Sequence, residues 1–546
     1  MALAPALRDA ALRWIADDPD PATRSELQQV LAAAMAGGAT GSAAEAAADA
    51  TAELADRMSG PLRFGTAGLR GPVRAGPAGM NVAVVTRATA GLAAWLAAEG
   101  ISGTVVVGRD ARHGSAEFAA AAARVLTGAG FTVALLDGPV PTPLVAFAVR
   151  ELGAVAGVTV TASHNPPADN GYKVYLGDGA QIVPPADARI EAAIAAAPAA
   201  VSVPLGPEPA PAEVTGAYLD RVATLPRSPG GPAPRVALTP MHGVGGALVT
   251  AALARTGVDD VHVVAAQARP DPDFPTVTFP NPEEPGATDA LLALAAERGA
   301  DLAIALDPDA DRCAIGVPDT GGTWRMLSGD ETGVLLGDHL LRRPAPGAPA
   351  EPLVATTVVS SSMLAAVAAG RGARSAETLT GFKWIVRAGE GLVYGYEEAI
   401  GICADPDGVR DKDGISAAVV AADLVRALAA DGSSVPQRLD ELAAEFGLHA
   451  TAGVSVRMEP AARDAAVVRL RDAPPAGWET DRPAPDVLRL RRAGERVVIR
   501  PSGTEPKLKA YLEVVEAPGP DVAAARSRAA ARLTALRTEL DGILGA

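Results

Sequence analysis

Short apolar runs alternate with amphipathic stretches along most of the chain. In the first unit, an apolar run at 104–107 is followed by a helical pattern over 115–128 and by a second apolar run at 131–136. Such short runs predict buried strands, and the longer period between them predicts a crossover helix. The same order recurs at 235–264 and at 353–375. The pattern therefore predicts three α/β domains with mixed or mainly parallel sheets.

The two ends of the chain have different patterns. Residues 9–57 predict polar, Ala-rich helices that precede the first α/β unit. Beyond 447, strict alternation at 451–457, further strands at 497–499 and 510–513, and a closing helix from 521 predict an α+β domain. We expect four domains at 1–230, 231–327, 328–448 and 449–546, with connections rich in Pro and Gly at 204–211 and 227–234 and a surface loop at 343–352.

Composition narrows the classes of function. The chain has 546 residues, which suits about four domains of ordinary size. Its formal charge of −16 argues against nucleic acid or an anionic membrane as a partner, so a phosphorylated ligand would need a local basic pocket. Cys313 and Cys403 are too few for a disulfide framework. With no signal-peptide pattern at the N-terminus and no long apolar run, we expect a cytoplasmic protein.

The segment 159–167 displays one serine prominently. An apolar approach ends in Ser163-His164-Asn165-Pro166, and the proline stops any regular structure. The alternative is an ordinary Asx-turn or helix-cap loop. Asn170-Gly171-Tyr172-Lys173 favours a functional loop, because a turn there would return Lys173 toward the serine as an acid/base or charge-stabilising group. A phosphorylated Ser163 would serve as a phosphoryl donor.

Three carboxylates at alternate positions end a second apolar run. Asp307, Asp309 and Asp311 form a site for a hard cation. An EF-hand loop also begins in this way, but Arg312 replaces its glycine and Pro318 its closing glutamate. Three single-oxygen ligands leave room for a phosphate oxygen, which suits Mg²⁺ better than Ca²⁺.

Two further segments suit a phosphosugar. The run from Arg500 to Lys507 combines a guanidinium, the hydroxyls of Ser502 and Thr504, and loop N–H groups, which together can bind phosphate. Glu397 and Glu398 lie between glycines, where they can accept hydrogen bonds from sugar hydroxyls. Taken alone, each is also compatible with an ordinary exposed turn.

In this order the four segments resemble the α-D-phosphohexomutase superfamily, whose members interconvert sugar 1-phosphates and sugar 6-phosphates. The resemblance extends from Arg63 onward and includes 64–71 and 380–383. It implies four domains around a central cleft, a phosphoserine enzyme, a bisphosphorylated sugar intermediate, Mg²⁺, and glucose 1,6-bisphosphate as activator. The residues it implies are catalytic Arg70, Ser163, His164, Lys173 and Arg312; metal-binding Ser163, Asp307, Asp309 and Asp311; and substrate-binding Thr380, Gly381, Lys383, Glu397, Glu398, Arg500, Ser502, Gly503 and Thr504.

The segment 397–401, which we call the sugar loop, departs from the family at one position. Many relatives have a serine after the acidic pair, whereas this chain has Ala399. The N-terminal helices and residues 397–401 look most like the branch containing a phosphoglucomutase with phosphopentomutase activity. We therefore expect a phosphoglucomutase acting as monomer or homodimer, with phosphomannomutase and phosphopentomutase as alternatives. A metal-dependent sugar phosphatase and a noncatalytic sugar-phosphate sensor are the rivals from other classes.

Overall fold

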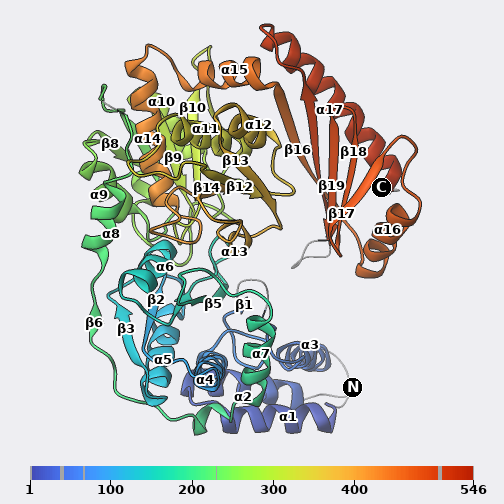
Figure 1. Cartoon of the computed structure of the whole chain (residues 1–546). Helices are drawn as coiled ribbons and strands as arrows, with labels where there is room; N and C mark the ends of the chain where they lie inside the picture. The colour runs from blue at the N-terminus through green and yellow to red at the C-terminus, as the bar shows by residue number, and fades with distance from the viewer. Residues whose placement is uncertain (1–2, 37–41, 65–67, 229, 502–506, 545–546) are drawn as a thin grey trace.

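The structure is a computed structural model that describes residues 3–36, 42–64, 68–228, 230–501 and 507–544. Its described residues form four β-sheets that follow one another along the chain (Figure 1). Three of them mix parallel and antiparallel strands with helices, and the fourth is wholly antiparallel. This confirms the predicted fold class. No helix of the described ranges is both long and apolar enough to cross a membrane.

The N-terminal helices precede the first sheet and have a small core of their own. They are α1 (Pro5–Asp17), α2 (Pro21–Met35) and α3 (Ser42–Arg57). Helix α1 begins before the predicted start at Asp9, because Pro5 occupies a first-turn position that needs no N–H donor. Arg57 bonds Glu26, Glu53 and the carbonyl of Ala75, and thereby fastens the helices to the first sheet region.

The first sheet has the strand order β1-β5-β4-β2-β3-β6. Its elements are β1 (Leu69–Pro72), α4 (Val82–Ala98), β2 (Thr104–Arg109), α5 (Ser115–Gly128), β3 (Thr132–Leu136), α6 (Thr142–Glu151), β4 (Ala156–Val160), β5 (Asp169–Leu176), α7 (Ala186–Ala196), the 3₁₀ turn η1 (Ala200–Ser202), β6 (Pro211–Ala212) and α8 (Thr215–Val222). The loop at 204–211 does not end this unit, since β6 still pairs with β3.

The second and third sheets repeat this plan with orders β11-β10-β9-β7-β8 and β13-β12-β14-β15. The second contains β7 (Val236–Thr239), α9 (Gly246–Arg255), β8 (Val261–Val263), η2 (Ala265–Gln267), α10 (Asp289–Arg298), β9 (Leu302–Leu306), β10 (Cys313–Pro318) and β11 (Trp324–Met326). The third contains α11 (Gly329–Arg342), β12 (Leu353–Thr357), α12 (Met363–Gly370), β13 (Arg374–Thr378), α13 (Phe382–Ile385), β14 (Leu392–Glu397), β15 (Gly401–Cys403), α14 (Gly414–Ala430) and α15 (Val435–Phe446).

The fourth sheet packs its own core against α16 and α17 (Figure 1), and Val487 and Val498 also pack against Val358 and Val359 of the third sheet region. Its order is β16-β20-β19-β18-β17. The elements are β16 (Leu448–Arg457), α16 (Pro460–Asp472), β17 (Glu479–Ala484), β18 (Val487–Arg492), β19 (Glu495–Pro501), β20 (Lys507–Glu516) and α17 (Val522–Leu544).

The first three sheets share one continuous apolar core, and α14 is buried along most of its length within it. Gly414 allows the start of α14 to approach the loop after β9, because a Cβ there would lie 2.5 Å from the carbonyl oxygen of Arg312. The N–H of Gly414 also donates to the carbonyl of Ala310. The core therefore fixes the relative positions of the loops that carry the predicted chemistry.

Those loops occupy equivalent places in the three sheets. Strands β4, β9 and β14 each pair with a parallel strand on one side and lead directly into an antiparallel neighbour on the other. The connecting loops carry the serine, the three aspartates and Glu398, while Glu397 is the last residue of β14. Each loop contains a non-glycine residue with positive φ: Ser163 (54°), Ala310 (55°) and Ile400 (54°). Such backbone is costly for these residue types and is concentrated at functional sites.

Candidate active site

Ser163 lies at the centre of the cluster, 3% exposed. Its backbone N–H donates to Oγ1 of Thr161 at 2.9 Å, which holds the left-handed turn. Its hydroxyl donates to Oδ2 of Asp307 at 3.0 Å and lies 3.1 Å from Nδ1 of His164. We call residues 161–168, between β4 and β5, the serine loop, and residues 307–312, between β9 and β10, the acidic loop. The two loops are therefore in direct contact, as expected for a serine that works beside a metal.

The acidic loop is closed to solvent, with Asp307, Asp309 and Asp311 each 0% exposed. Ligand oxygens of all three lie within 4.8 Å of one another. Asp309 and Asp311 each direct one oxygen, Oδ2, at protein donors. Their second oxygens, Oδ1, are buried and have no hydrogen-bond partner among the described residues. Two unpaired buried carboxylate oxygens beside a third carboxylate fit a hard divalent cation.

Lys173 reaches the acidic loop from a strand, whereas the sequence predicts a turn that returns it toward Ser163. Residues 170–173 belong to β5, which runs back antiparallel to β4. The ammonium of Lys173 donates to Asp309 at 2.8 Å and to Asp311 at 2.9 Å. Burial alone would lower the pKa of Lys173, but the two carboxylates outweigh it and raise the pKa. A lysine held in its charged form favours the charge-stabilising role over acid/base chemistry.

Two arginines add positive charge around the serine. Arg70, on β1, donates to Oδ1 of Asn165 at 2.9 Å. Arg312 donates its N–H to Asp307 at 3.0 Å and its guanidinium to Glu283 at 3.2 Å. Burial, and then the charges of Arg312 and Arg70, lower the pKa of His164 well below its ordinary value, so its imidazole is neutral. Cationic side chains therefore lie on the same side of the cluster as the serine, among the carboxylates of the acidic loop.

The two glutamates of the third sheet have different surroundings. Oε2 of Glu398 accepts hydrogen bonds from Ser360 at 2.9 Å and Thr357 at 3.2 Å, so that oxygen is already engaged by the protein. Burial raises the pKa of Glu397 to about 7, although Lys412 and Arg312 oppose the shift. Glu397 therefore belongs to the same electrostatic cluster as the acidic loop, whereas Glu398 is tied to the end of β12.

Two other predicted residues, Lys383 and Arg500, have partners outside the serine and the aspartates. Lys383 is buried on α13 with its ammonium 5.7 Å from the centre of the Trp384 ring, beyond the loop that contains Thr380 and Gly381. Arg500, at the end of β19, donates to the hydroxyl of Tyr511 at 3.1 Å. Ser502, Gly503 and Thr504 lie outside the described residues.

Three residues of the site have no counterpart in the sequence prediction. Thr142, at the start of α6, donates to Oδ2 of Asp309 at 2.7 Å. Lys412 forms an ion pair with Asp311 at 2.8 Å. Arg112 bonds backbone carbonyls of the serine loop. The lone lysine between Asp411 and Asp413 was a usable signal, because two acids around a lysine before a helix suggest a fixed ammonium.

A cavity of about 760 Å³ borders the site. It is lined by Glu398 and Ala399 of the sugar loop, by Glu283, and by Lys509 and Tyr511 of the fourth sheet. The second, third and fourth sheet regions therefore meet beside the cluster in a space that suits a small polar ligand.

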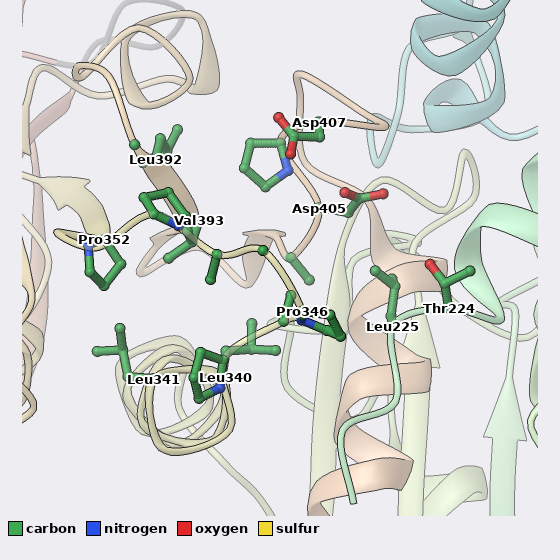
Figure 2. A pocket seen from close by; sticks show the side chains of 18 of the residues that line it. Thr224, Leu225, Leu340, Leu341, Pro346, Pro352, Leu392, Val393, Asp405 and Asp407 are labelled. Atoms are coloured by element: carbon green, nitrogen blue, oxygen red, sulfur yellow. The ribbon is translucent and has the colours of Figure 1, made fainter.

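A separate cavity of about 810 Å³ contains none of the predicted site residues. Figure 2 shows it bordered by Leu340 and Leu341 on one side and by Asp405 and Asp407 on another. Asp405 is engaged by a bidentate contact from Arg221.

Family models match the chain in four consecutive segments. The phosphoglucomutase/phosphomannomutase alpha/beta/alpha domains I, II and III match residues 61–200, 217–321 and 328–446, and the C-terminal domain of that family matches residues 454–531. The chain belongs to the phosphoglucomutase/phosphomannomutase family. As a member of this isomerase family it is a phosphosugar mutase.

Individual relatives agree with this assignment. A probable phosphomannomutase of Haemophilus influenzae is 42% identical, with 80% of this chain and 93% of the relative covered. A probable phosphoribomutase of Schizosaccharomyces pombe is 35% identical, with coverages of 82% and 78%. The crystal structure of a putative phosphomannomutase from Thermus thermophilus superposes with a TM-score of 0.67 at 26% identity, covering 87% of this chain and 100% of that one.

Proposed function

We propose that this phosphosugar mutase interconverts glucose 1-phosphate and glucose 6-phosphate through a phosphorylated Ser163, and that it also accepts pentose 1-phosphates. The observation that carries the mechanism is the contact of the Ser163 hydroxyl with Asp307, inside a pocket to which Lys173, Arg70 and Arg312 contribute positive charge. A serine so placed suits a phosphoryl carrier, because the arriving and resident phosphates are both anionic.

In the proposed reaction a sugar hydroxyl attacks the phosphorus on Ser163. The new P–O bond forms as the bond from Oγ to phosphorus breaks, and overall the proton passes from the sugar hydroxyl to Oγ. The resulting bisphosphate turns round within the site and returns its other phosphate to Ser163 by the reverse exchange. Glucose 1,6-bisphosphate would therefore load the unphosphorylated enzyme.

Asp307, Asp309 and Asp311 would hold Mg²⁺ together with an oxygen at Ser163. The unpaired Oδ1 atoms of Asp309 and Asp311 support this assignment. Bound Mg²⁺ would supply neutralisation of the charge that develops on the transferring phosphoryl group. Lys173, Thr142 and Lys412 engage the other oxygens of Asp309 and Asp311, so the protein itself orients these ligands.

Substrate binding would be shared between the third and fourth sheets. Glu397, Glu398 and the loop containing Thr380, Gly381 and Lys383 would contact the sugar. Arg500 would bind the non-reacting phosphate together with Ser502, Gly503 and Thr504. The resemblance of residues 397–401 and of the N-terminal helices to the phosphoglucomutase/phosphopentomutase branch supports glucose and pentose. The Haemophilus relative keeps mannose 1-phosphate as the second candidate.

The decisive experiment combines intact-protein mass spectrometry with coupled assays of isomerisation and phosphate release. Wild type incubated with glucose 1,6-bisphosphate should carry one phosphate, which peptide mapping should place on Ser163. Ser163→Ala should carry none and lose turnover, whereas Ser434→Ala, which alters the cap of α15, should keep both. Turnover by pure Ser163→Ala would refute the phosphoserine mechanism, and phosphate release without isomerisation would establish a phosphatase.

A further inference from the structure

The guanidinium of Arg112 lies inside the bend of the serine loop. One nitrogen, Nη2, donates to the carbonyls of Ser163 at 2.6 Å and Asn165 at 2.5 Å. The other, Nη1, donates to the carbonyls of Pro166 at 2.8 Å and Asp169 at 3.1 Å. Arg112 is 4% exposed, so these four contacts are made away from water. One side chain therefore bonds four carbonyl groups between Ser163 and Asp169, the first residue of β5.

The chemistry of the loop explains why an arginine is needed there. Buried carbonyls require donors, and a loop that leaves its strand cannot obtain them from sheet pairing. Arginine offers five N–H donors in a planar fork, whereas lysine offers three on one atom. The left-handed backbone at Ser163 adds a conformational cost that surrounding contacts must offset. Arg112 supplies contacts of this kind at the residue that carries the nucleophilic oxygen.

Asp110 in turn contacts both the side chain and the backbone of Arg112. Nε of Arg112 lies 3.4 Å from Oδ2 of Asp110, and the Arg112 backbone N–H donates to the other oxygen of Asp110 at 2.9 Å. That oxygen also accepts the hydroxyl of Ser115 at 2.6 Å. The end of β2 and the start of α5 therefore orient the guanidinium, which lowers the entropy that it loses on binding the loop.

A segment from the second sheet region covers the opposite side of Arg112. The guanidinium carbon lies 4.9 Å from the centre of the Phe274 ring, a cation–π distance. Phe274 is 3% exposed and has φ of 46° in the long irregular segment between η2 and α10. The same segment contributes Glu283 to Arg312 of the acidic loop. The segment therefore contacts Arg112, which bonds the serine loop, and Arg312, which belongs to the acidic loop.

We infer that Arg112 is a positioning residue for the serine loop and that Phe274 secures it from the second sheet region, so that Oγ of Ser163 stays aimed at the acidic loop. The inference rests on the proposed phosphoserine function for its kinetic consequences. It has a structural consequence as well, because loss of the guanidinium should loosen the loop even in protein that performs no turnover.

The test compares Arg112→Gln and Arg112→Lys with Arg438→Gln. Arg438 is a matched control because it is also buried, at 6% exposure, but bonds Asp338 far from the serine loop. In unphosphorylated protein, hydrogen exchange of the amides of Asn165 and Asp169 should be about tenfold faster or more in Arg112→Gln than in wild type, and unchanged in Arg438→Gln. Equal exchange in wild type and Arg112→Gln would overturn the inference, whether or not the protein is a mutase.

Kinetics give the second readout. All variants are measured at a temperature where each is folded. Arg112→Gln should then lose about tenfold to a hundredfold in kcat, with KM changed by less than about threefold. The reason is that the carrier oxygen is misplaced while the sugar site is intact. Arg112→Lys should recover part of the loss. A fall in kcat no larger than that of Arg438→Gln would contradict positioning.

Phe274→Leu covers the case in which Arg112→Gln does not fold. It removes the ring but keeps an apolar side chain, and should produce the same faster exchange and lower kcat in weaker form. Wild-type exchange and kinetics in Phe274→Leu would contradict the part assigned to Phe274. If wild type shows no isomerisation at all, the proposed function fails, while the exchange experiment still decides the positioning role.

Discussion

Lys173 and Lys412 form ion pairs with the same oxygen, Oδ2 of Asp311, from different parts of the chain. Lys173 comes from β5 of the first sheet, at 2.9 Å, and Lys412 from the loop before α14, at 2.8 Å. The residues on either side of Lys412 fix its direction: Asp411 accepts from Tyr175 and Gln181, and Asp413 accepts from Tyr218. The acidic loop is therefore clamped between the first and third sheet regions.

We expect Lys412→Met to lower kcat by about tenfold to a hundredfold, because it removes one of two buried cations from Asp311 and leaves excess negative charge where phosphate must bind. Arg410→Met is the control, since Arg410 lies two residues away but its nearest carboxylate is Asp178, at 3.9 Å. Steady-state kinetics of both variants check the prediction. Wild-type kinetics in Lys412→Met would show that the second lysine is dispensable.

Much of this arrangement was predictable from pattern alone. The strands around Thr104, Val236 and Leu353 were located by short apolar runs, because burial on both faces of a parallel strand leaves a distinctive signature. The loops with Ser163 and Asp307 were located because polar residues follow such runs directly. Both kinds of signal are local in the sequence.

The unpredicted features depend on contacts between distant segments. Thr142 meets Asp309 across 167 positions, and Arg112 meets the serine loop across more than 50. A threonine in the first turn of a helix is ordinary, so nothing local marks it as a partner of the acidic loop. The sequence also predicts a turn where the structure has the antiparallel strand that carries Lys173, because Asn-Gly is a common turn dipeptide.

Thr142→Val should raise the Mg²⁺ concentration needed for half-maximal activity by about fivefold, since it deletes one hydrogen bond to Asp309 worth about 1 kcal/mol while preserving shape. The backbone contact from Thr142 to the Asp309 carbonyl remains in the variant. Thr89→Val is the matched control: Thr89 is equally buried, but its hydroxyl pairs with Tyr172. An identical Mg²⁺ titration for Thr142→Val and wild type would remove Thr142 from the metal site.

Arg500→Ala should raise KM and lower kcat, because the proposed distal phosphate contact both anchors the sugar and directs its opposite end toward Ser163. Loss of a charge-assisted contact costs about 1.5–3 kcal/mol, or roughly tenfold to a hundredfold in kcat/KM. Arg491→Ala serves as control, since Arg491 is on β18 and pairs with Asp481. Equal kinetics for the two variants would exclude Arg500 from substrate binding.

Acid should weaken the attachment of the fourth sheet through Glu513. Burial opposes its ionisation, but His449 and Arg496 outweigh this and lower its pKa from 4.5 to about 2. Glu513 also accepts from Ser361 and Ser362 of the third sheet region. Because the folded pKa lies below the unfolded one, the carboxylate stabilises the fold above pH 4.5, and this contribution is lost as the pH falls toward 2.

Glu513→Gln should therefore lower stability at pH 7 by about 3 kcal/mol and by much less near pH 3. Urea unfolding of wild type and variant at both pH values checks this, with the exposed Glu479→Gln as control. A difference between wild type and Glu513→Gln that stays constant with pH would show that Glu513 is not the group responsible.

Ala399 provides the sharpest test of substrate choice. It follows the acidic pair and lines the cavity beside the sugar loop, at the position where the family resemblance leads us to expect a serine. Its neighbour Glu398 is already engaged by Thr357 and Ser360, so the chain holds this part of the loop without a hydroxyl at 399. A site with fewer fixed contacts to the sugar should discriminate less between a hexose and a pentose ring. We expect good turnover of glucose 1-phosphate, measurable turnover of ribose 1-phosphate, and weaker use of mannose 1-phosphate.

Ala399→Ser should move the ratio of kcat/KM values toward hexose by no more than the roughly 1 kcal/mol, about fivefold, that one partly solvated hydrogen bond supplies. Ala452→Ser, on the β16 wall of the same cavity, controls for added polarity away from the sugar loop. The measurement is a panel of glucose, mannose and ribose 1-phosphates with glucose 1,6-bisphosphate present. A wild-type preference for mannose 1-phosphate by a wide margin would reverse the assignment, because the acidic pair would then select for the other configuration at C2 despite the missing hydroxyl.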